Sequence, residues 1–244
     1  MRAITHIHTD RSWDSRTRIH RLADVLTHHR IELALVCDHN DFGGSLALRA
    51  LTAERGLDLR VPVAAEIRTD QGDVIVAFDH GEPPPVEALS TWPDLRDEVR
   101  RRGGLIWLPH PYQSHTGVED LAAGADVIEV FNARCSGWQN ERAAELCRRH
   151  GAVPAYGADA HRLAEVGRFV VHYPPAPSPV AALRTAPVCL EPVPARRSDV
   201  AAAEVVNGFT RRRPTLIGYN LARWAAYRAR EVVRPFPGDG DAAP

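Results

Sequence analysis

The chain of 244 residues contains no lysine, so arginine supplies all 30 of its basic side chains. This absence excludes mechanisms that need a lysine amine, such as Schiff-base catalysis and the lysine of a nucleotide-binding P-loop. The four cysteines include no Cys-x-x-Cys pair, which excludes a zinc ribbon. We expect reduced and mostly buried thiols.

Long apolar runs and a strong charge bias are also missing. No stretch approaches about 18 uninterrupted apolar residues, and the first residues follow a strand pattern rather than that of a signal segment. The net charge of -1 gives no bulk attraction for long nucleic acid. With 44% hydrophobic residues, the chain suits one globular domain with a sizeable core. We expect a soluble cytoplasmic protein that binds neither membranes nor long nucleic acid; its oligomeric state stays open.

Short apolar runs alternate with segments of helical spacing, which is typical of βα units around a parallel sheet. The strand-like runs are 2–8, 33–37, 61–66, 73–78, 104–108, 126–131, 153–156 and 168–172. The helix-like segments between them are 17–30, 44–55, 94–102 and 139–150. The pattern predicts an α/β fold.

The composition changes after residue 172, where four prolines lie between residues 174 and 179. We predict three parts, namely a barrel domain at 1–175, an accessory segment at 176–234 that packs on it, and a disordered tail at 235–244. The accessory segment can form helices at 198–209 and 218–233. The predicted buried stripe of the second helix is Leu221, Trp224, Ala225 and Val232. Packing over the barrel and a dimer contact through Trp224 and Tyr227 are both open.

Metal-ligating residue types follow at least five separate apolar runs. His6 and His8 end the first run, and Asp159 and His161 repeat this spacing far downstream. On a strand, residues i and i+2 point to the same side, so each pair presents two ligands together. The residues of the same kind between them are Asp38, His39, Glu66 and His110. Parallel α/β barrels build their sites at the carboxyl ends of strands, and the pattern therefore predicts a metal site.

An ordered series of motifs covers about the first 170 residues. They are His6-Ile7-His8-Thr9, Asp14, Cys37-Asp38-His39-Asn40, Ala65-Glu66-Ile67, Leu108-Pro109-His110-Pro111, Ile128-Glu129-Val130-Phe131-Asn132-Ala133-Arg134 and Gly157-Ala158-Asp159-Ala160-His161. This series resembles the polymerase and histidinol phosphatase (PHP) family of metal-dependent phosphoesterases. The resemblance implies a distorted (β/α)7 barrel, here followed by the helical extension, with a cluster of two to three divalent metals.

Carried over by position, the resemblance also implies a ligand set. His6, His8, Glu66 and Asp159 would surround one metal, and Glu66 would bridge to a second metal that also takes His110. The third metal would be held by Asp14, His39 and His161. For the remaining position on the second metal, the resemblance suggests Asp73, with Asp79 and His80 as neighbours.

Strand alternation puts Asp38 and His39 on opposite faces. We expect His39 to face the metals and Asp38 to orient an imidazole from behind. Glu129 and Asn132 also have opposite parity, so at most one of them should face the site directly.

Two further residues are candidates for substrate contact. Arg134 beside a metal cluster offers a bidentate grip on phosphate, although a surface salt bridge would also explain it. His115 is a possible extra contact from a loop over the site.

Imidazole and carboxylate ligands without thiolate suit Zn, Mn or Fe(II). We expect a metal-dependent phosphoesterase in which a hydroxide held between two metals attacks phosphorus, and Arg134 and the cluster neutralise the phosphoryl oxygens. The substrates expected are small, such as nucleotides, short oligonucleotides, or sugar and amino-alcohol phosphates. The alternatives are an amidohydrolase-like metal hydrolase, whose usual bridging carbamylated lysine has no counterpart here, and a metal-binding module without activity.

Overall fold

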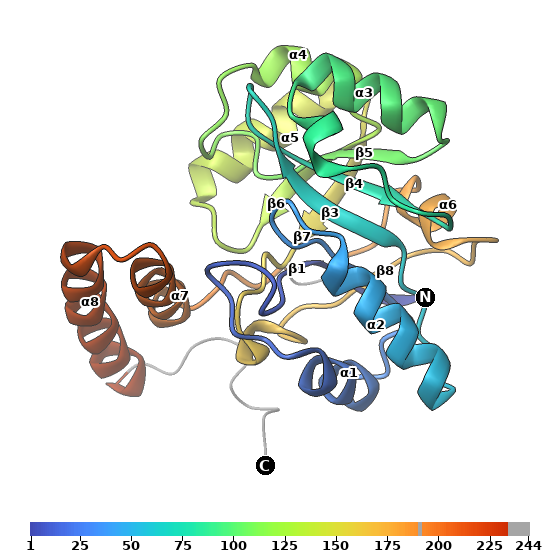
Figure 1. Ribbon diagram of the computed structural model, residues 1–244. Helices are drawn as coiled ribbons and strands as arrows, with labels where there is room; N and C mark the ends of the chain where they lie inside the picture. The colour runs from blue at the N-terminus through green and yellow to red at the C-terminus, as the bar shows by residue number, and fades with distance from the viewer. Residues whose placement is uncertain (190–191, 234–244) are drawn as a thin grey trace.

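The computed structural model describes residues 1–189 and 192–233, and within them the strands form two sheets (Figure 1). The smaller sheet has the order β2-β1-β8, with β1 at Arg2–Ile7, β2 at Leu33–Val36 and β8 at Val171–His172. The larger sheet follows chain order and consists of β3 (Val63–Arg68), β4 (Asp73–Phe78), β5 (Leu105–Leu108), β6 (Val127–Asn132) and β7 (Val153–Gly157). Every predicted strand has a counterpart, and the last one is shorter than expected.

The α/β class is confirmed, but the strand directions differ from those of a parallel barrel. β1 and β2 are parallel, as are β5, β6 and β7, whereas β3, β4 and β5 pair antiparallel. In the turn between β3 and β4, the backbone N–H of Thr69 donates to the carbonyl oxygen of Gly72 over 2.9 Å. A turn of this length leaves no room for the crossover that parallel strands need. The sheets are not closed into the expected (β/α)7 barrel.

Isolated backbone bridges join the two sheets where β1, β2, β3 and β7 end. Ile7 pairs with Ala160, and His39 pairs with Glu66. The Ala160 N–H donates to the carbonyl oxygen of His6 over 3.0 Å, and the Asn40 N–H donates to that of Glu66 over 2.8 Å. These bridges bring the carboxyl ends of distant strands into one place.

Helices cover the sheets. Figure 1 shows α3, α4 and α5 together over the larger sheet, whereas α1 and α2 lie side by side near the smaller one. The helix bounds are α1 Ile19–His28, α2 Gly43–Arg55, α3 Trp92–Arg101, α4 Val118–Gly124 and α5 Gly137–His150, with short 3₁₀ turns η1 at Val86–Leu89 and η2 at Leu163–Glu165. The four predicted helices are present within a few residues, and α4 is an addition.

The larger sheet separates two hydrophobic cores, and β4 shows how. Alternation sends Ile75 and Ala77 into the core shared with β1 and β2. Val74, Val76 and Phe78 point the other way and pack with Trp92 and Leu95 of α3. Burial on both faces explains why this strand is an uninterrupted apolar run in the sequence.

The C-terminal segment forms α6 (Pro179–Leu183), α7 (Arg197–Thr210) and α8 (Pro214–Val233). Helices α7 and α8 pack on each other as a hairpin at the side of the molecule (Figure 1). The predicted stripe of α8 is not buried, since Leu221 and Trp224 are 46% and 40% exposed and Ala225 is exposed as well. Asn220 is the residue that α8 buries instead.

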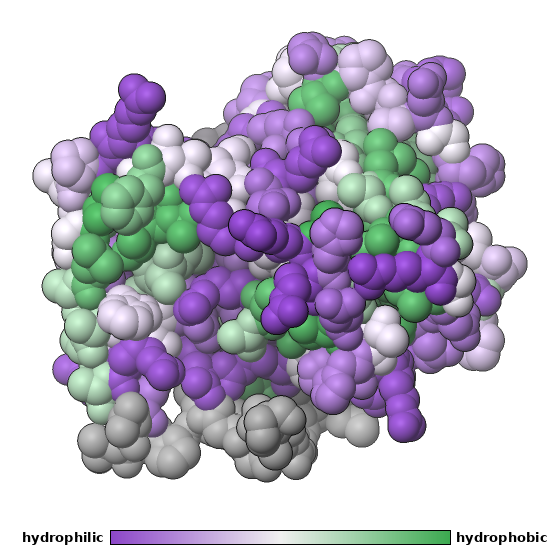
Figure 2. All heavy atoms as spheres, turned by 60° about the horizontal axis from the view of Figure 1, so that its bottom comes forward, coloured by the Kyte–Doolittle hydropathy of each residue, from purple (hydrophilic) through white to green (hydrophobic). Residues whose placement is uncertain are grey.

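Some predictions about the C-terminal segment concern residues beyond the description. The side chain of Val232 and the tail at 235–244 lie outside the described residues. Figure 2 shows apolar atoms gathered over the hairpin at its left, where Phe209, Tyr219, Leu221 and Trp224 are exposed. None of the described helices combines the length and the hydrophobicity that crossing a bilayer requires.

Candidate metal centre

The structure brings all eight predicted ligands together at the bridged strand ends. They are His6, His8, Asp14, His39, Glu66, His110, Asp159 and His161. Glu66 lies at the middle of the group, because its carboxylate faces His6, His8, His39 and His110. The side chains of His6, His8 and Glu66 are fully buried.

One set of ligands is His6, His8, Glu66 and Asp159. The Nε2 atoms of His6 and His8 lie 3.5 and 3.4 Å from Glu66 Oε2, and 3.7 and 3.4 Å from Asp159 Oδ1. Most of these separations are long for hydrogen bonds. Two ligands each about 2.1 Å from a tetrahedral metal lie about 3.4 Å apart, so the set has the spacing of a coordination shell.

His6 and His8 point together toward Glu66 and Asp159, but the strand is not regular where they lie. His6 has a φ of +62°, and the β1–β2 register shifts between Ile4 and Ile7, so β1 is irregular where the pair lies. His110 and Asp159 also have positive φ values, of +27° and +49°. Residues other than glycine rarely adopt this conformation, and it is a form of strain that functional sites concentrate. The backbone is thus bent to aim three candidate ligands inward.

The second and third sets surround the first. Nε2 of His110 lies 3.0 Å from Glu66 Oε1. Asp14 Oδ2 lies 3.4 Å from His39 Nε2 and 3.2 Å from His161 Nε2. The ring of His8 contacts those of His39 and His161, with centroids 4.5 and 4.2 Å apart. Three groups of side chains have ligand atoms close enough to hold one ion each, namely His6, His8 and Asp159, then His6, Glu66 and His110, and then His8, His39 and His161.

Several buried atoms of this cluster have no hydrogen-bond partner. They are His6 Nε2, His8 Nε2, Asp14 Oδ1, Glu66 Oε2 and His110 Nδ1. Leaving a buried polar atom unsatisfied costs roughly 1–3 kcal/mol, so a concentration of such atoms needs an explanation. Imidazole nitrogens and carboxylate oxygens are the donors that Zn, Mn and Fe accept. The residues present therefore fit a divalent metal cluster.

The protonation states of the three carboxylates and of His8 agree with this fit. Burial would raise the pKa of Glu66, but His39 and His6 hold it well below its usual range. Burial, together with His161 and His39, lowers the pKa of His8 to about 3. Ionised carboxylates and neutral imidazoles are the forms that bind metal. His6, His39 and His110 differ, because burial lowers their pKa values but the nearby acidic groups together outweigh it and raise them, that of His39 to about 9. Metal binding at these rings would therefore release protons.

Comparisons with known proteins show which family model and which structures the chain resembles. A family model described as PHP-associated matches residues 137–186, the segment that carries Asp159 and His161. The structure of a two-domain protein containing a predicted PHP-like metal-dependent phosphoesterase from Bacteroides vulgatus superposes with a TM-score of 0.53 at 14% identity, over 68% of this chain and 53% of that one. Part of the chain thus matches the PHP-associated family model, and its fold is similar to that of a PHP-like protein.

Two further relatives complete the comparison. PsfC from Pseudomonas syringae superposes with a TM-score of 0.58 at 16% identity, over 86% of this chain and 98% of that one. The uncharacterized protein MJ0417 of Methanocaldococcus jannaschii is 31% identical over 149 residues, which are 57% of this chain and 56% of that protein. The chain thus spans little more than half the length of this curated relative.

Among the described residues, the Asp38 carboxylate hydrogen-bonds to Thr9 and Ser12 and not directly to an imidazole. Its carboxylate accepts hydrogen bonds from the backbone N–H of Thr9 at 2.6 Å, the Thr9 hydroxyl at 2.7 Å and the Ser12 hydroxyl at 2.6 Å. The Ser12 hydroxyl lies 3.2 Å from His8 Nδ1, so Asp38 orients His8 through Ser12. The sequence analysis missed Thr9 and Ser12, although two hydroxyl residues directly after a ligand pair were a usable signal.

Glu129 and Asn132 hydrogen-bond to each other, although their positions along the strand predict opposite faces. The β6–β7 register shifts between Glu129 and Phe131, and such an irregularity resets the alternation. Glu129 Oε1 lies 2.7 Å from His6 Nδ1, and Asn132 Nδ2 donates to Glu129 Oε2 over 3.0 Å. Only Glu129 contacts a candidate ligand. It orients His6 with Nε2 toward the cluster.

Arg134 is not a surface salt bridge, because its side chain is only 8% exposed. Its Nη1 lies 3.4 Å from the carbonyl oxygen of Asp159 and 3.8 Å from Glu165 Oε1. Glu165 Oε2 also accepts the backbone N–H of His161 over 2.8 Å. Sequence reasoning overlooked Glu165, which lies past the last motif and carries no pattern of its own.

The residues considered for the remaining position on the second metal do not all lie near the cluster. Asp73 lies near the cluster, where burial and the charge of Glu66 raise its pKa to about 6. His115 contacts the carbonyl oxygen of Asp73 through Nε2 at 2.9 Å, and its ring centroid is 5.6 Å from that of His110. Asp79 caps α6 by accepting the Val180 N–H over 2.8 Å, and His80 is exposed. Asp73 and His115 are therefore placed to extend the site, whereas Asp79 has a structural role.

Proposed function

We propose that this protein is a metal-dependent phosphoesterase that hydrolyses small phosphomonoesters or phosphodiesters. The observation that carries the proposal is the convergence of unpartnered imidazole and carboxylate atoms on Glu66, in a buried cluster built from separate strand ends. The likeness to the B. vulgatus protein, whose description includes a metal-dependent phosphoesterase, supports the same function. An enzyme of this class needs such a cluster and a cation for the phosphoryl oxygens.

Each set of ligands would hold one ion. His6, His8 and Asp159 would hold the first, with Glu66 reaching a second ion beside His110. Asp14, His39 and His161 would hold a third. Bound divalent metals would supply Lewis-acid activation of water and of the phosphoryl group. Zn, Mn and Fe(II) all suit this donor set.

The chain's own residues prepare the site for an anionic substrate. Arg134 is held near Asp159 by Glu165, and its guanidinium offers bidentate hydrogen bonds to phosphoryl oxygens. Glu129 and Ser12 fix the imidazole rings of His6 and His8 from behind. This support keeps the ligand geometry from depending on the metal alone.

The net charge of the chain bears on the class of substrate. The net charge of -1 provides no extended attraction for long nucleic acid. We therefore favour small phosphorylated molecules such as nucleotides, short oligonucleotides, or sugar and amino-alcohol phosphates.

The first experiment combines elemental analysis of protein purified without chelator with phosphate release from a panel of small phosphoesters. We expect two to three equivalents of divalent metal and release from at least one ester. Chelation should abolish release, and adding back Zn, Mn or Fe(II) should restore it.

Two other results would replace the proposal. Metal with turnover of amide or cyclic amide substrates, and none of phosphoesters, would assign an amidohydrolase-like activity. No stoichiometric metal and no turnover after refilling would mean that the cluster belongs to a binding module.

A further inference from the structure

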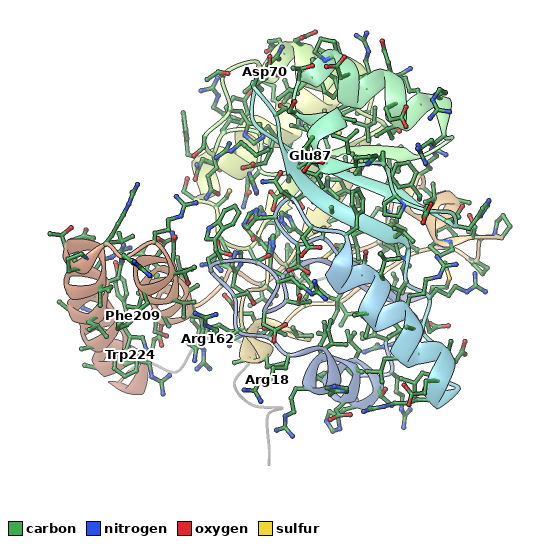
Figure 3. The ribbon with its side chains drawn as sticks, in the orientation of Figure 1. Arg18, Asp70, Glu87, Arg162, Phe209 and Trp224 are labelled. Atoms are coloured by element: carbon green, nitrogen blue, oxygen red, sulfur yellow. The ribbon has the colours of Figure 1, made fainter. Side chains whose placement is uncertain are left out.

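The C-terminal hairpin contacts the segment that carries Asp14. Arg162 Nη1 forms an ion pair of 2.6 Å with Asp199 Oδ1 of α7, and Figure 3 shows Arg162 between the hairpin and the rest of the molecule. At the other end of α7, Arg16 Nη2 donates to Thr210 Oγ1 over 3.3 Å. Helix α7 is thus held at both ends beside the candidate metal centre.

Trp13 connects the end of α7 to the cluster. Its ring stacks on His39 with centroids 4.2 Å apart and an interplanar angle of 15°. The guanidinium carbon of Arg211, the residue after α7, lies 4.9 Å from the centroid of the Trp13 ring. Arg211 is therefore one side chain removed from a candidate metal ligand, while its own side chain is exposed and accessible.

One face of α7 is turned toward the centre. Glu204, Asn207 and Arg211 have the i, i+3, i+7 spacing that puts residues on the same face of a helix. Burial opposes the charge of Arg134, but Glu165, Asp159, Asp14 and Glu204 together raise its pKa, so Glu204 lies within electrostatic reach of Arg134. Asn207 Oδ1 is buried without a partner. Glu204 thus acts on Arg134, and Arg211 on the same face of the helix reaches Trp13.

The positive charge of Arg211 has no carboxylate partner among the described residues. In the part of the chain that the structure describes, no carboxylate lies within ion-pairing distance of Arg16 or of Arg211, Arg212 and Arg213. The acidic residues of α7 are already engaged, since Asp199 pairs with Arg162, and Glu204 accepts from Asn207 and acts on Arg134.

A second arginine run provides a contrast. Arg101 and Arg102 both pair with Glu98, at 2.8 and 2.6 Å, and Arg100 donates to the carbonyl oxygen of Gly124 over 3.1 Å. Those arginines stabilise the C-terminal end of α3. Among the described residues, the run at 211–213 has no carboxylate partner of this kind, so its charge can act on a ligand.

We propose that Arg211, held over Trp13, binds an oxyanion on the leaving group of the substrate. This inference rests on the proposed phosphoesterase function, in which the cluster and Arg134 take the scissile phosphate. The preferred substrates are then small phosphoesters with a second anionic group, a carboxylate or a phosphate, beyond the ester bond. A guanidinium matches the geometry of either group.

The test compares three ligands that cannot be hydrolysed, measured by isothermal titration with metal-loaded protein. Phenylphosphonate has no second anion, 4-phosphonobenzoate adds a carboxylate, and 1,4-phenylenebisphosphonate adds a phosphonate. We expect the unaltered protein to prefer at least one of the two bifunctional ligands. In the Arg211→Gln variant, the ratio of affinities that expresses this preference should fall roughly tenfold, as expected for the loss of a charge-assisted hydrogen bond. In Arg211→Glu the preference should be reversed.

The matched control is Arg101→Gln, which removes one positive charge from the paired run and should keep the preference. The inference is overturned when the unaltered protein shows no preference or when Arg211→Gln retains it in full. If the preference that depends on Arg211 is for 4-phosphonobenzoate, the second group is a carboxylate. If it is for 1,4-phenylenebisphosphonate, the second group is a phosphate. Phosphate release from phenyl phosphate by the same samples tests the proposed function separately, because the binding preference requires no turnover.

Discussion

The metal centre and the C-terminal hairpin follow opposite rules in the same chain. In the centre, polar side chains are buried and each is fixed by several partners, as when Glu129 holds both the His6 ring and the His110 backbone. In the hairpin, apolar side chains are exposed, including Phe209 at 61% and Tyr219 at 64%. Hydropathy alone would predict that the polar side chains of the centre are exposed and that the apolar side chains of the hairpin are buried. What decides burial is which surfaces the fold brings together.

The largest expected effect is at Asp159, in the centre. Asp159→Asn keeps the size of the side chain but removes the charge that faces His6 and His8, so it weakens metal binding. We expect phosphate release to fall by at least about a thousandfold, comparable to the loss of a main electrostatic element of a catalytic site. Elemental analysis should show less than the normal metal content.

The control for this change is Asp97→Asn, at an exposed residue that pairs with its neighbour Arg96. It should retain both metal and activity. Normal metal content and turnover in Asp159→Asn would show that the centre does not depend on this carboxylate.

Arg134 should give the next largest effect. Arg134→Gln removes the guanidinium beside the cluster without touching a candidate ligand, so phosphate release should fall roughly a hundredfold while the metal content is kept. Arg134→Lys should recover little, because an ammonium group cannot make two parallel hydrogen bonds.

Steady-state kinetics and elemental analysis of the same samples check this prediction. Arg149→Gln, which removes a surface partner of Glu119, serves as the comparison and should be neutral. Loss of metal in Arg134→Gln would instead show that the arginine is needed to keep the cluster intact.

Gly157 tests how tightly the centre is packed. A Cβ at this position would lie 2.1 Å from Glu129 Oε1, the atom that contacts His6. Glu129 is buried and cannot swing into solvent, so Gly157→Ala should lower the free energy of unfolding by about 2 kcal/mol, as overpacking of a core does. Denaturant unfolding measures this value.

Gly137→Ala is the matched control, because nothing lies within 4 Å of the added Cβ at the start of α5. It should be neutral or stabilise the protein by up to about 1 kcal/mol. Equal effects of the two substitutions would mean that Glu129 is not fixed as the contacts indicate.

The hairpin should give the smallest effect. Trp224→Ser replaces a large aromatic side chain that is 40% exposed, and we expect the free energy of unfolding to change by less than about 1 kcal/mol. Trp107→Ala, in the core, should cost about 3–5 kcal/mol in the same assay. A loss above about 2 kcal/mol at Trp224 would show that this surface is buried in solution, for example against a second copy of the chain.

Much of the fold could be predicted because local signals are strong. Ser136 forms a capping box with Gln139 at the start of α5, and Gly151 ends the helix in the left-handed conformation. The hairpin helices were also predicted within a few residues, but their buried side was not. The periodicity of α8 shows which residues share a face, and only packing decides which face is covered.

The sequence by itself determined the chemical inventory of the centre. Imidazoles and carboxylates follow the ends of apolar runs, and strand ends in α/β proteins meet at one edge, so most candidate ligands could be named without coordinates. Asp14 and the grouping of the ligands came from the resemblance to the PHP family. Residue types at strand ends are local properties of a chain.

Tertiary structure decided how these residues are aimed. The positive φ of His6 and the register shift in β6 both depart from ideal alternation, and each lies where the strand pairs with another part of the chain. The place of Arg211 over Trp13 likewise depends on how α7 docks. Side-chain direction and long-range docking are set by the balance of packing and hydrogen bonds over the whole molecule, which no short stretch of sequence contains.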